Sequence, residues 1–111
     1  MTNQEVFDKV VAHARQQGGK AVNEDGCVCV YRNGLGHKCF AGIFIPDEDY
    51  KPKMEGNPIR SLVIDYNLFS QVDTNLLFEL QVIHDYTEAA GWETRFMRLA
   101  DTRGLVYKEP T

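Results

Sequence analysis

Three cysteines and a histidine fall within residues 27–40, CVCVYRNGLGHKCF, and they are the first candidates for chemistry in this chain. Thiolate sulfur and imidazole nitrogen bind zinc in a tetrahedron, so one interpretation is a zinc site formed by Cys27, Cys29, His37 and Cys39. The spacing weighs against it. A C-x-C pair in an extended strand places its sulfurs about 6–7 Å apart, whereas structural sites generally use C-x₂₋₄-C turns. Both ligand pairs would also belong to one hairpin.

The residue types of this stretch predict a β-hairpin. β-branched and aromatic residues over Cys27–Arg32 indicate a strand, and His37–Phe40 is the expected return strand. Asn33-Gly34-Leu35-Gly36 between them is typical of a turn, because asparagine and glycine adopt positive φ at low cost.

In a hairpin with a three-residue loop at residues 33–35, Cys29 lies opposite Cys39. Two facing thiols can form a disulfide, act as a redox switch or pack as small apolar groups. An odd number of cysteines in a reducing compartment favours packing. We therefore expect both thiols to be reduced, mutually close and largely buried beneath the helix over residues 74–90, near His84.

A cysteine nucleophile needs a base and a group that orients the base. The alternative enzymatic or ligand-binding interpretation uses Cys39, with His84 and Arg32 nearby in space. Asp85 follows His84, but adjacent residues diverge by about 100° on a helix, so Asp85 is not expected to orient the imidazole. His84 and His13 both follow apolar stripes, and we interpret them as hydrogen-bonded, part-buried core residues.

Residues 46–57 form an acidic loop that contains Pro46-Asp47 and Asp49-Tyr50-Lys51, an order similar to the PD…(D/E)xK pattern of metal-dependent nucleases. Such sites place two acids on neighbouring strands around one Mg²⁺ ion. Here the halves abut within one short loop, which favours a solvated surface. Exposed loops often carry binding residues, and the candidates are Asp47, Glu48, Asp49, Tyr50 and Glu55.

Helical signals surround the predicted hairpin. Thr2 and Glu5 fit a capping box for a first helix that Gly18-Gly19 ends. Asn57-Pro58 is a start signal for a second helix, with asparagine as the cap. Asp73 or Thr74 caps a third, which Gly91 closes and whose apolar stripe is Leu76, Leu77, Leu80 and Ile83. A fourth carries the stripe Trp92, Phe96, Leu99 and Ala100 and ends at Gly104.

Two short apolar runs are harder to classify. Periodicity cannot assign residues 41–45, for which we favour a buried helical turn ended by Pro46, and residues 105–107 are a candidate terminal strand. Taken together, these elements predict an α+β fold: a single small domain, residues 1–111, with about four helices packed around one β-hairpin.

Composition limits the classes of function. The net charge of −4 argues against a nucleic-acid binder, which needs a basic face, but is compatible with a protein that binds basic proteins. No segment approaches the roughly 20 apolar residues that span a bilayer. We expect a cytoplasmic protein with no membrane association, no nucleic-acid partner and no cofactor.

Several short motifs occur in a characteristic order, namely Cys29-Val30-Tyr31-Arg32, Lys38-Cys39-Phe40-Ala41-Gly42, Ile45-Pro46-Asp47-Glu48-Asp49-Tyr50, Met54-Glu55-Gly56, Ile59-Arg60 and Ile83-His84-Asp85. In this order the chain resembles a family of small uncharacterised proteins from bacteriophages, prophages and bacteria. Phe40 departs from the pattern, which has alanine directly after the cysteine, and Cys27 lies outside it. The resemblance implies an origin and a shared fold, and it implies no activity.

The leading functional hypothesis is a small non-enzymatic protein of a phage or mobile element that binds a host protein, such as a defence or regulatory factor, in the host cytoplasm. The acidic loop is the predicted binding surface. The alternatives are a small enzyme or ligand-binding domain that uses Cys39 with His84, and a module that zinc stabilises through the four ligands named above.

Overall fold

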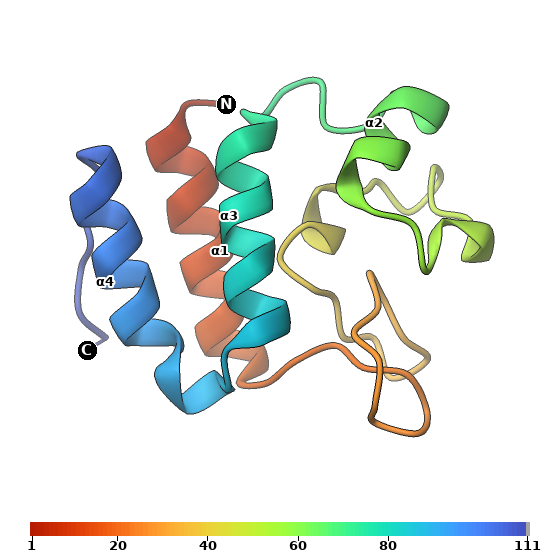
Figure 1. Ribbon diagram of the computed structural model, residues 1–111, viewed down its shortest axis with the longest axis horizontal. Helices are drawn as coiled ribbons and strands as arrows, with labels where there is room; N and C mark the ends of the chain where they lie inside the picture. Colours follow the sequence, from red (N-terminus) through yellow and green to blue (C-terminus); the bar gives the residue numbers. More distant parts are fainter. Residues whose placement is uncertain (111) are drawn as a thin grey trace.

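In the computed structural model, which describes residues 1–110, four α-helices make up most of the regular structure. They are α1 (Asn3–Gln17), α2 (Ile59–Tyr66), α3 (Thr74–Tyr86) and α4 (Trp92–Arg103). Helices α1, α3 and α4 lie side by side, whereas α2 stands apart among the loops that residues 18–58 form (Figure 1). The remaining elements are single turns of 3-10 helix: η1 (Gly42–Phe44), η2 (Pro52–Met54) and η3 (Ala89–Gly91).

Helix α3 contributes to two hydrophobic cores. The first core joins α1, α3 and α4, and Phe40 from the loop region is buried in it, with its ring 4.9 Å from that of Trp92. The second core lies between α3, α2 and the loops, and includes Tyr31, Cys39 and Met54. From α3, Leu77 belongs to the second core, while the first receives Leu76, Leu80 and Ile83. α3 is therefore the element against which both halves of the molecule pack.

Both ends of α1, the start of α3 and the end of α4 confirm the capping predictions. The Thr2 hydroxyl accepts a hydrogen bond from the Glu5 N–H, and the Glu5 carboxylate accepts one from the Thr2 N–H, at 3.1 and 2.8 Å. Asp73 caps α3 by accepting bonds from two backbone N–H groups of the first turn. Gly18 and Gly104 take the left-handed conformation, with φ of 75° and 67°, and end α1 and α4.

The predicted α+β fold is wrong, because residues 27–40 do not form a β-hairpin. In residues 1–110, the β-type pairings are two isolated antiparallel bridges, Val22 with Cys29 and Arg32 with Lys38. The second bridge closes a loop of residues 33–37, so Tyr31 rather than Cys29 lies opposite Cys39. The domain is mostly helical, with an irregular half in place of the hairpin.

Side chains take the place of the missing strand ladder. The N–H groups of Tyr31 and Arg32 donate to the two oxygens of the Glu55 carboxylate. The Asn33 side chain accepts bonds from two N–H groups of its own turn. A backbone donor that a side chain binds is not available to a neighbouring strand. Further side-chain acceptors for backbone N–H groups in this region are Asn23, Gln17, Gln81, His84 and Cys39.

Element boundaries differ from the predictions in three places. Helix α3 ends at Tyr86 and not near Gly91, because Thr87 adopts an extended conformation. Helix α2 begins at Ile59, with Pro58 and not Asn57 at the cap position. The segment over residues 105–107 is not a strand. The buried helical turn expected within residues 41–45 is confirmed by η1.

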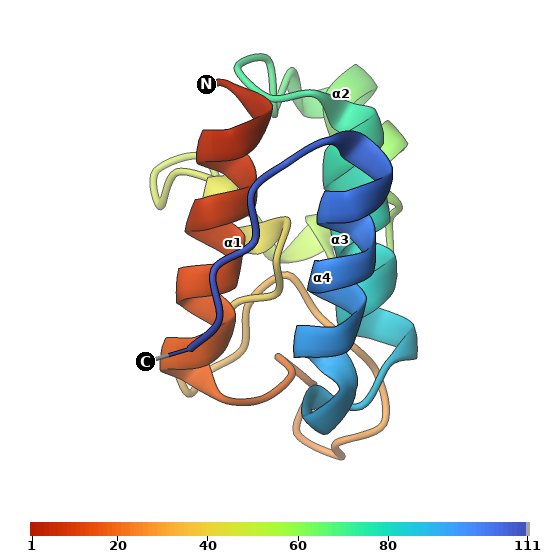
Figure 2. The ribbon, with the colours of Figure 1, turned by 90° about the vertical axis from the view of Figure 1, so that its left-hand side faces the viewer.

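The last described residues lie along α1 (Figure 2). The Gln4 side chain donates to the Val106 carbonyl and accepts from the Val106 N–H, at 2.9 and 2.8 Å. Arg15 donates to the Lys108 carbonyl and forms an ion pair with Glu93 of α4. These contacts hold residues 106–108 against the side of the α1–α4 pair that is remote from α2 (Figure 1).

Candidate functional site

A groove of about 370 Å³ lies between α3 and the loops that face it. Helix α3 forms one wall, and residues 29–31 and 55–59 form the other. Clefts of several hundred Å³ with apolar walls and a few polar groups are typical of binding sites. The residues that α3 contributes are Phe78, Gln81, Val82, Asp85 and Tyr86.

Three side chains of α3 form an exposed apolar stripe on this wall. Phe78, Val82 and Tyr86 are spaced four residues apart, which places them on one face of the helix, and they are 59%, 37% and 83% exposed. The four apolar residues predicted to face the core are all buried. α3 thus carries more apolar surface than its two cores cover. Sequence reasoning missed this second stripe, although its spacing is visible in the sequence.

The opposite wall contains Glu55, whose carboxylate binds the loop that precedes η1. One oxygen accepts the Tyr31 N–H at 2.8 Å, and the other accepts the Arg32 N–H at 3.2 Å and the Tyr50 hydroxyl at 2.8 Å. The Tyr31 hydroxyl donates to the Asn57 carbonyl at 2.6 Å. Glu55 therefore fixes the shape of the wall while its half-buried carboxylate borders the groove.

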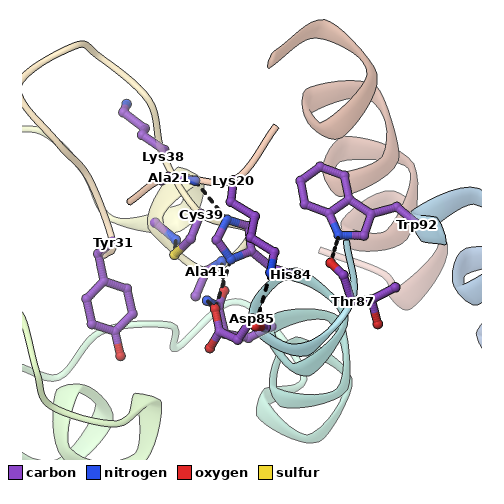
Figure 3. Close-up of polar contacts among 12 residues, drawn as sticks. Lys20, Ala21, Tyr31, Lys38, Cys39, Ala41, His84, Asp85, Thr87 and Trp92 are labelled. Atoms are coloured by element: carbon purple, nitrogen blue, oxygen red, sulfur yellow. Dashed lines mark hydrogen bonds and ion pairs between the residues drawn. The ribbon is translucent and has the colours of Figure 1, made fainter. Parts of the chain in front are cut away.

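His84 is fully buried, and both of its ring nitrogens are hydrogen-bonded (Figure 3). Nε2 lies 3.1 Å from the Ala21 nitrogen, and because a backbone N–H can only donate, Nε2 accepts this bond. The proton is then on Nδ1, which donates to Asp85 Oδ1 at 2.8 Å. Asp85 thus orients the neighbouring imidazole, and the prediction that it would not is wrong, because the two side chains reach toward each other at the end of α3.

His84 is a hydrogen-bonded core residue, as predicted, and it is more deeply buried than expected. It links separate parts of the fold. Its ring packs against Phe40 and Trp92, with centroid distances of 5.0 and 5.7 Å, and its bond to Ala21 ties α3 to the loop after α1. Neither nitrogen has a free lone pair for a base or a metal ligand. His13 is also part-buried as predicted. It donates to the Lys38 carbonyl, and burial lowers its pKa.

The four predicted zinc ligands are not brought together. Cys27 is exposed and Cys39 is fully buried, and no three of the four meet within residues 1–110. The potential ligands that do meet there are Cys29, His84 and Asp85, within 4.8 Å of one another. This set does not fit a metal, because a metal on Nδ1 of His84 would leave a proton on Nε2 that opposes the Ala21 N–H.

The cysteines are free thiols, as expected, but Cys29 is only half-buried and pairs with Val22. The Cys39 sulfur accepts the Gly42 N–H at 3.2 Å, and burial raises the pKa of this thiol to about 12. Burial, with the charge of Asp85, also raises the pKa of Cys29. Both thiols therefore remain protonated at neutral pH, which gives no support to a cysteine nucleophile at either position.

We expect Cys39→Ser to destabilise the protein by about 1–3 kcal/mol, because a hydroxyl buried at this position is less well accommodated than a thiol. Urea unfolding of both proteins, with and without EDTA, measures the effect. Cys27→Ser, at an exposed position, is the control and should lie within about 0.5 kcal/mol of the wild type. A neutral Cys39→Ser variant, or an EDTA-dependent loss of wild-type stability, would contradict this account.

The acidic loop predicted as a binding surface is partly a structural element. Asp47 forms ion pairs with Arg32 and Lys38, at 2.9 and 3.6 Å. The Arg32 guanidinium also lies over the Tyr50 ring, 4.5 Å from its centroid. In residues 1–110 no side-chain hydrogen bond or ion pair involves the remaining two predicted residues, Glu48 and Asp49, which are exposed.

The charged groups that line the groove are acidic. Glu55 and Asp85 belong to its walls, and no lysine or arginine does. Within residues 1–110, neither carboxylate has a lysine or arginine at ion-pair distance. The Lys20 ammonium lies 3.4 Å from the backbone carbonyl of Asp85, and Arg32 directs its guanidinium to Asp47. The groove thus combines an apolar wall with two carboxylates that have no direct lysine or arginine partner within the described residues.

No family model, curated protein or solved structure matches the chain significantly. None of the helices in the described part of the chain has the length and apolar character needed to cross a membrane.

Proposed function

We propose that this chain is a small non-enzymatic protein of a phage or mobile element that binds a host protein through the groove beside α3. The observation that supports the proposal most is the exposed stripe of Phe78, Val82 and Tyr86. Exposed aromatic residues that border a groove are typical of protein–protein contact sites, where they supply much of the binding energy.

The acidic loop extends this proposed surface. Glu55 belongs both to the loop and to the groove wall, and Tyr50 contacts Glu55 directly. We include Asp47, Glu48 and Asp49 in the surface. Asp47 is already paired with Arg32 and Lys38, whereas the exposed carboxylates of Glu48 and Asp49 have no ion pair within residues 1–110 and favour approach of a basic partner. The phage origin rests on the resemblance of the C-x-Y-R and I-P-D-E-x-Y motifs, and the host cytoplasm is the location that follows from it.

Affinity capture from a lysate of the host bacterium tests this function. We expect the tagged wild-type chain to retain a stoichiometric protein, and the double variant Phe78→Ser/Tyr86→Ser to lose it by about tenfold or more, because exposed aromatic contacts dominate such interfaces. Met97→Ser is the matched control, since Met97 is a 48% exposed apolar residue on α4, outside the groove walls. Binding of the purified partner is then measured by calorimetry.

The double variant should unfold at nearly the same temperature as the wild type, because both residues are exposed. Two results would overturn the proposal. One is the absence of any stoichiometric partner in repeated captures. The other is a partner that binds the double variant as tightly as it binds the wild type and the Met97→Ser control.

A further inference from the structure

We propose that the groove beside α3 binds an arginine side chain of the partner, carried by a short segment with apolar neighbours. This inference rests on the proposed protein-binding function and names the chemistry of the bound segment.

The groove is complementary in charge to an arginine side chain. Asp85 and Glu55 reach the groove from opposite walls, and no cationic side chain lines it. Asp85 Oδ1 accepts bonds from two neutral donors, the Gln81 amide and His84 Nδ1, which leave the negative charge of the carboxylate in place. A carboxylate beside apolar surface interacts more strongly with a cation than one in bulk water does. The groove therefore favours a cationic ligand over an anionic or neutral one.

The aromatic residues of the α3 wall favour arginine over lysine as the bound cation. Phe78 and Tyr86 offer exposed aromatic faces next to Asp85 on the same wall. A guanidinium is planar, stacks on aromatic rings and donates to carboxylates in a fork geometry, whereas a lysine ammonium is a compact, strongly hydrated charge. The neighbouring Val82, with Pro58 across the groove, provides exposed apolar surface for the residues that flank the arginine. A segment with an arginine between two apolar residues would contact the carboxylates, the aromatic rings and the apolar surface together.

The chain itself contains a similar arrangement outside the groove. The Arg32 guanidinium lies over the Tyr50 ring and pairs with Asp47. The combination of an aromatic face and a carboxylate that we propose for a partner arginine is therefore one that this protein already uses for its own arginine.

A peptide titration followed by ¹H–¹⁵N NMR tests the inference. The probes are the capped peptide Ser-Leu-Arg-Leu-Ser and the same peptide with citrulline, which is nearly isosteric with arginine but uncharged. We expect the arginine peptide to shift the amide signals of residues 29–31, 55–59 and 78–86 and to bind about five- to tenfold more tightly than the citrulline peptide.

The variant Asp85→Asn separates charge from shape. Asparagine keeps an oxygen that can accept the bonds from Gln81 and His84, so the fold should persist, and a thermal melt checks it. We expect this variant to weaken the arginine peptide about five- to tenfold and to leave the citrulline peptide unchanged, as a double-mutant cycle requires for a direct charge contact. Asp101→Asn, an exposed carboxylate on α4, is the matched control and should change neither affinity.

Should Asp85→Asn lower the melting temperature strongly, Tyr86→Leu replaces it as the test, because this 83% exposed ring can be removed without opening a core. It should weaken the arginine peptide about two- to fivefold through loss of the aromatic face. Equal binding of the two peptides, no binding of either, or signal shifts confined to other surfaces would overturn the inference.

The two proposals fail in different ways. A captured partner that Phe78→Ser/Tyr86→Ser loses but Asp85→Asn retains at full affinity would leave the binding function standing and overturn the arginine assignment. Loss of the partner from both variants, with retention by Met97→Ser and Asp101→Asn, supports both proposals.

Discussion

Gly42→Ala is expected to destabilise the protein by at least about 3 kcal/mol, the largest effect that we predict for a single methyl group. A Cβ atom at this position would lie 2.1 Å from the Tyr31 carbonyl oxygen and 3.0 Å from its carbon. The backbone at Gly42 has no positive φ, so the cost comes from the clash and not from conformational strain. The contact is with backbone atoms, which cannot turn aside as a flexible side chain can.

The Tyr31 carbonyl has little freedom to move. It accepts the Cys39 N–H at 3.1 Å, while the N–H of the same residue donates to Glu55. The Tyr31 ring is held through its hydroxyl, which donates to the Asn57 carbonyl. A methyl group on residue 42 therefore has to break at least one of these bonds or displace η1.

Urea and thermal unfolding of Gly42→Ala measure the effect, which corresponds to a fall of about 10 °C or more in melting temperature for a domain of this size. Gly34→Ala is the matched control. No atom lies within 4 Å of its added Cβ and its φ is not positive, so it should lie within about 0.5 kcal/mol of the wild type. If Gly42→Ala is as stable as Gly34→Ala, η1 does not pack against the Tyr31 carbonyl as described.

The helices could be predicted from the sequence because their signals are local. The capping box at Thr2, the cap at Asp73 and the glycine at 104 each act within a few residues of the helix end that they determine. The buried stripes of α3 and α4 follow from periodicity alone. Errors at the ends of α2 and α3 were limited to a few residues.

The irregular half could not be predicted in the same way. Alternation over residues 27–32 is equally compatible with a strand and with a segment whose N–H groups are bound by distant side chains. Glu55 is 24 residues from Tyr31, and Gln81 is 40 residues from Ala41, so no local pattern reveals these bonds. The hairpin prediction failed because these long-range acceptors replace the strand partner.

The candidate site was predicted only in part. Glu55 and Tyr50 were predicted as binding residues because they belong to the acidic loop. Their role in holding Tyr31 and Arg32 depends on contacts between residues far apart in the sequence. The Phe78–Val82–Tyr86 stripe was open to recognition, since α3 has more apolar residues than one buried face requires. That Glu55 lies across a groove from the stripe could be learned only from the folded chain.

We expect Glu55→Gln to destabilise the protein by about 2–3 kcal/mol, although it replaces one side chain with another of nearly the same shape. The two carboxylate oxygens accept three hydrogen bonds, from the N–H groups of Tyr31 and Arg32 and from the Tyr50 hydroxyl. A glutamine amide offers one acceptor oxygen, and its NH₂ group can only donate. The Tyr50 hydroxyl can accept a hydrogen bond from this NH₂ group instead of donating one. One of the two backbone N–H groups, however, then faces the NH₂ group and has no acceptor.

Urea unfolding measures this loss, with Glu48→Gln as the matched control, because Glu48 is exposed and its side chain has no hydrogen bond or ion pair in residues 1–110. The control should lie within about 0.5 kcal/mol of the wild type. Tyr50 provides a second readout: burial, together with its bond to Glu55 and the charge of that carboxylate, raises its pKa to about 12. In Glu55→Gln the pKa of Tyr50 should fall, which absorbance at alkaline pH can follow. If Glu55→Gln is as stable as Glu48→Gln and the pKa of Tyr50 is unchanged, Glu55 does not hold the groove wall. Partner binding would then be the remaining proposed role of Glu55.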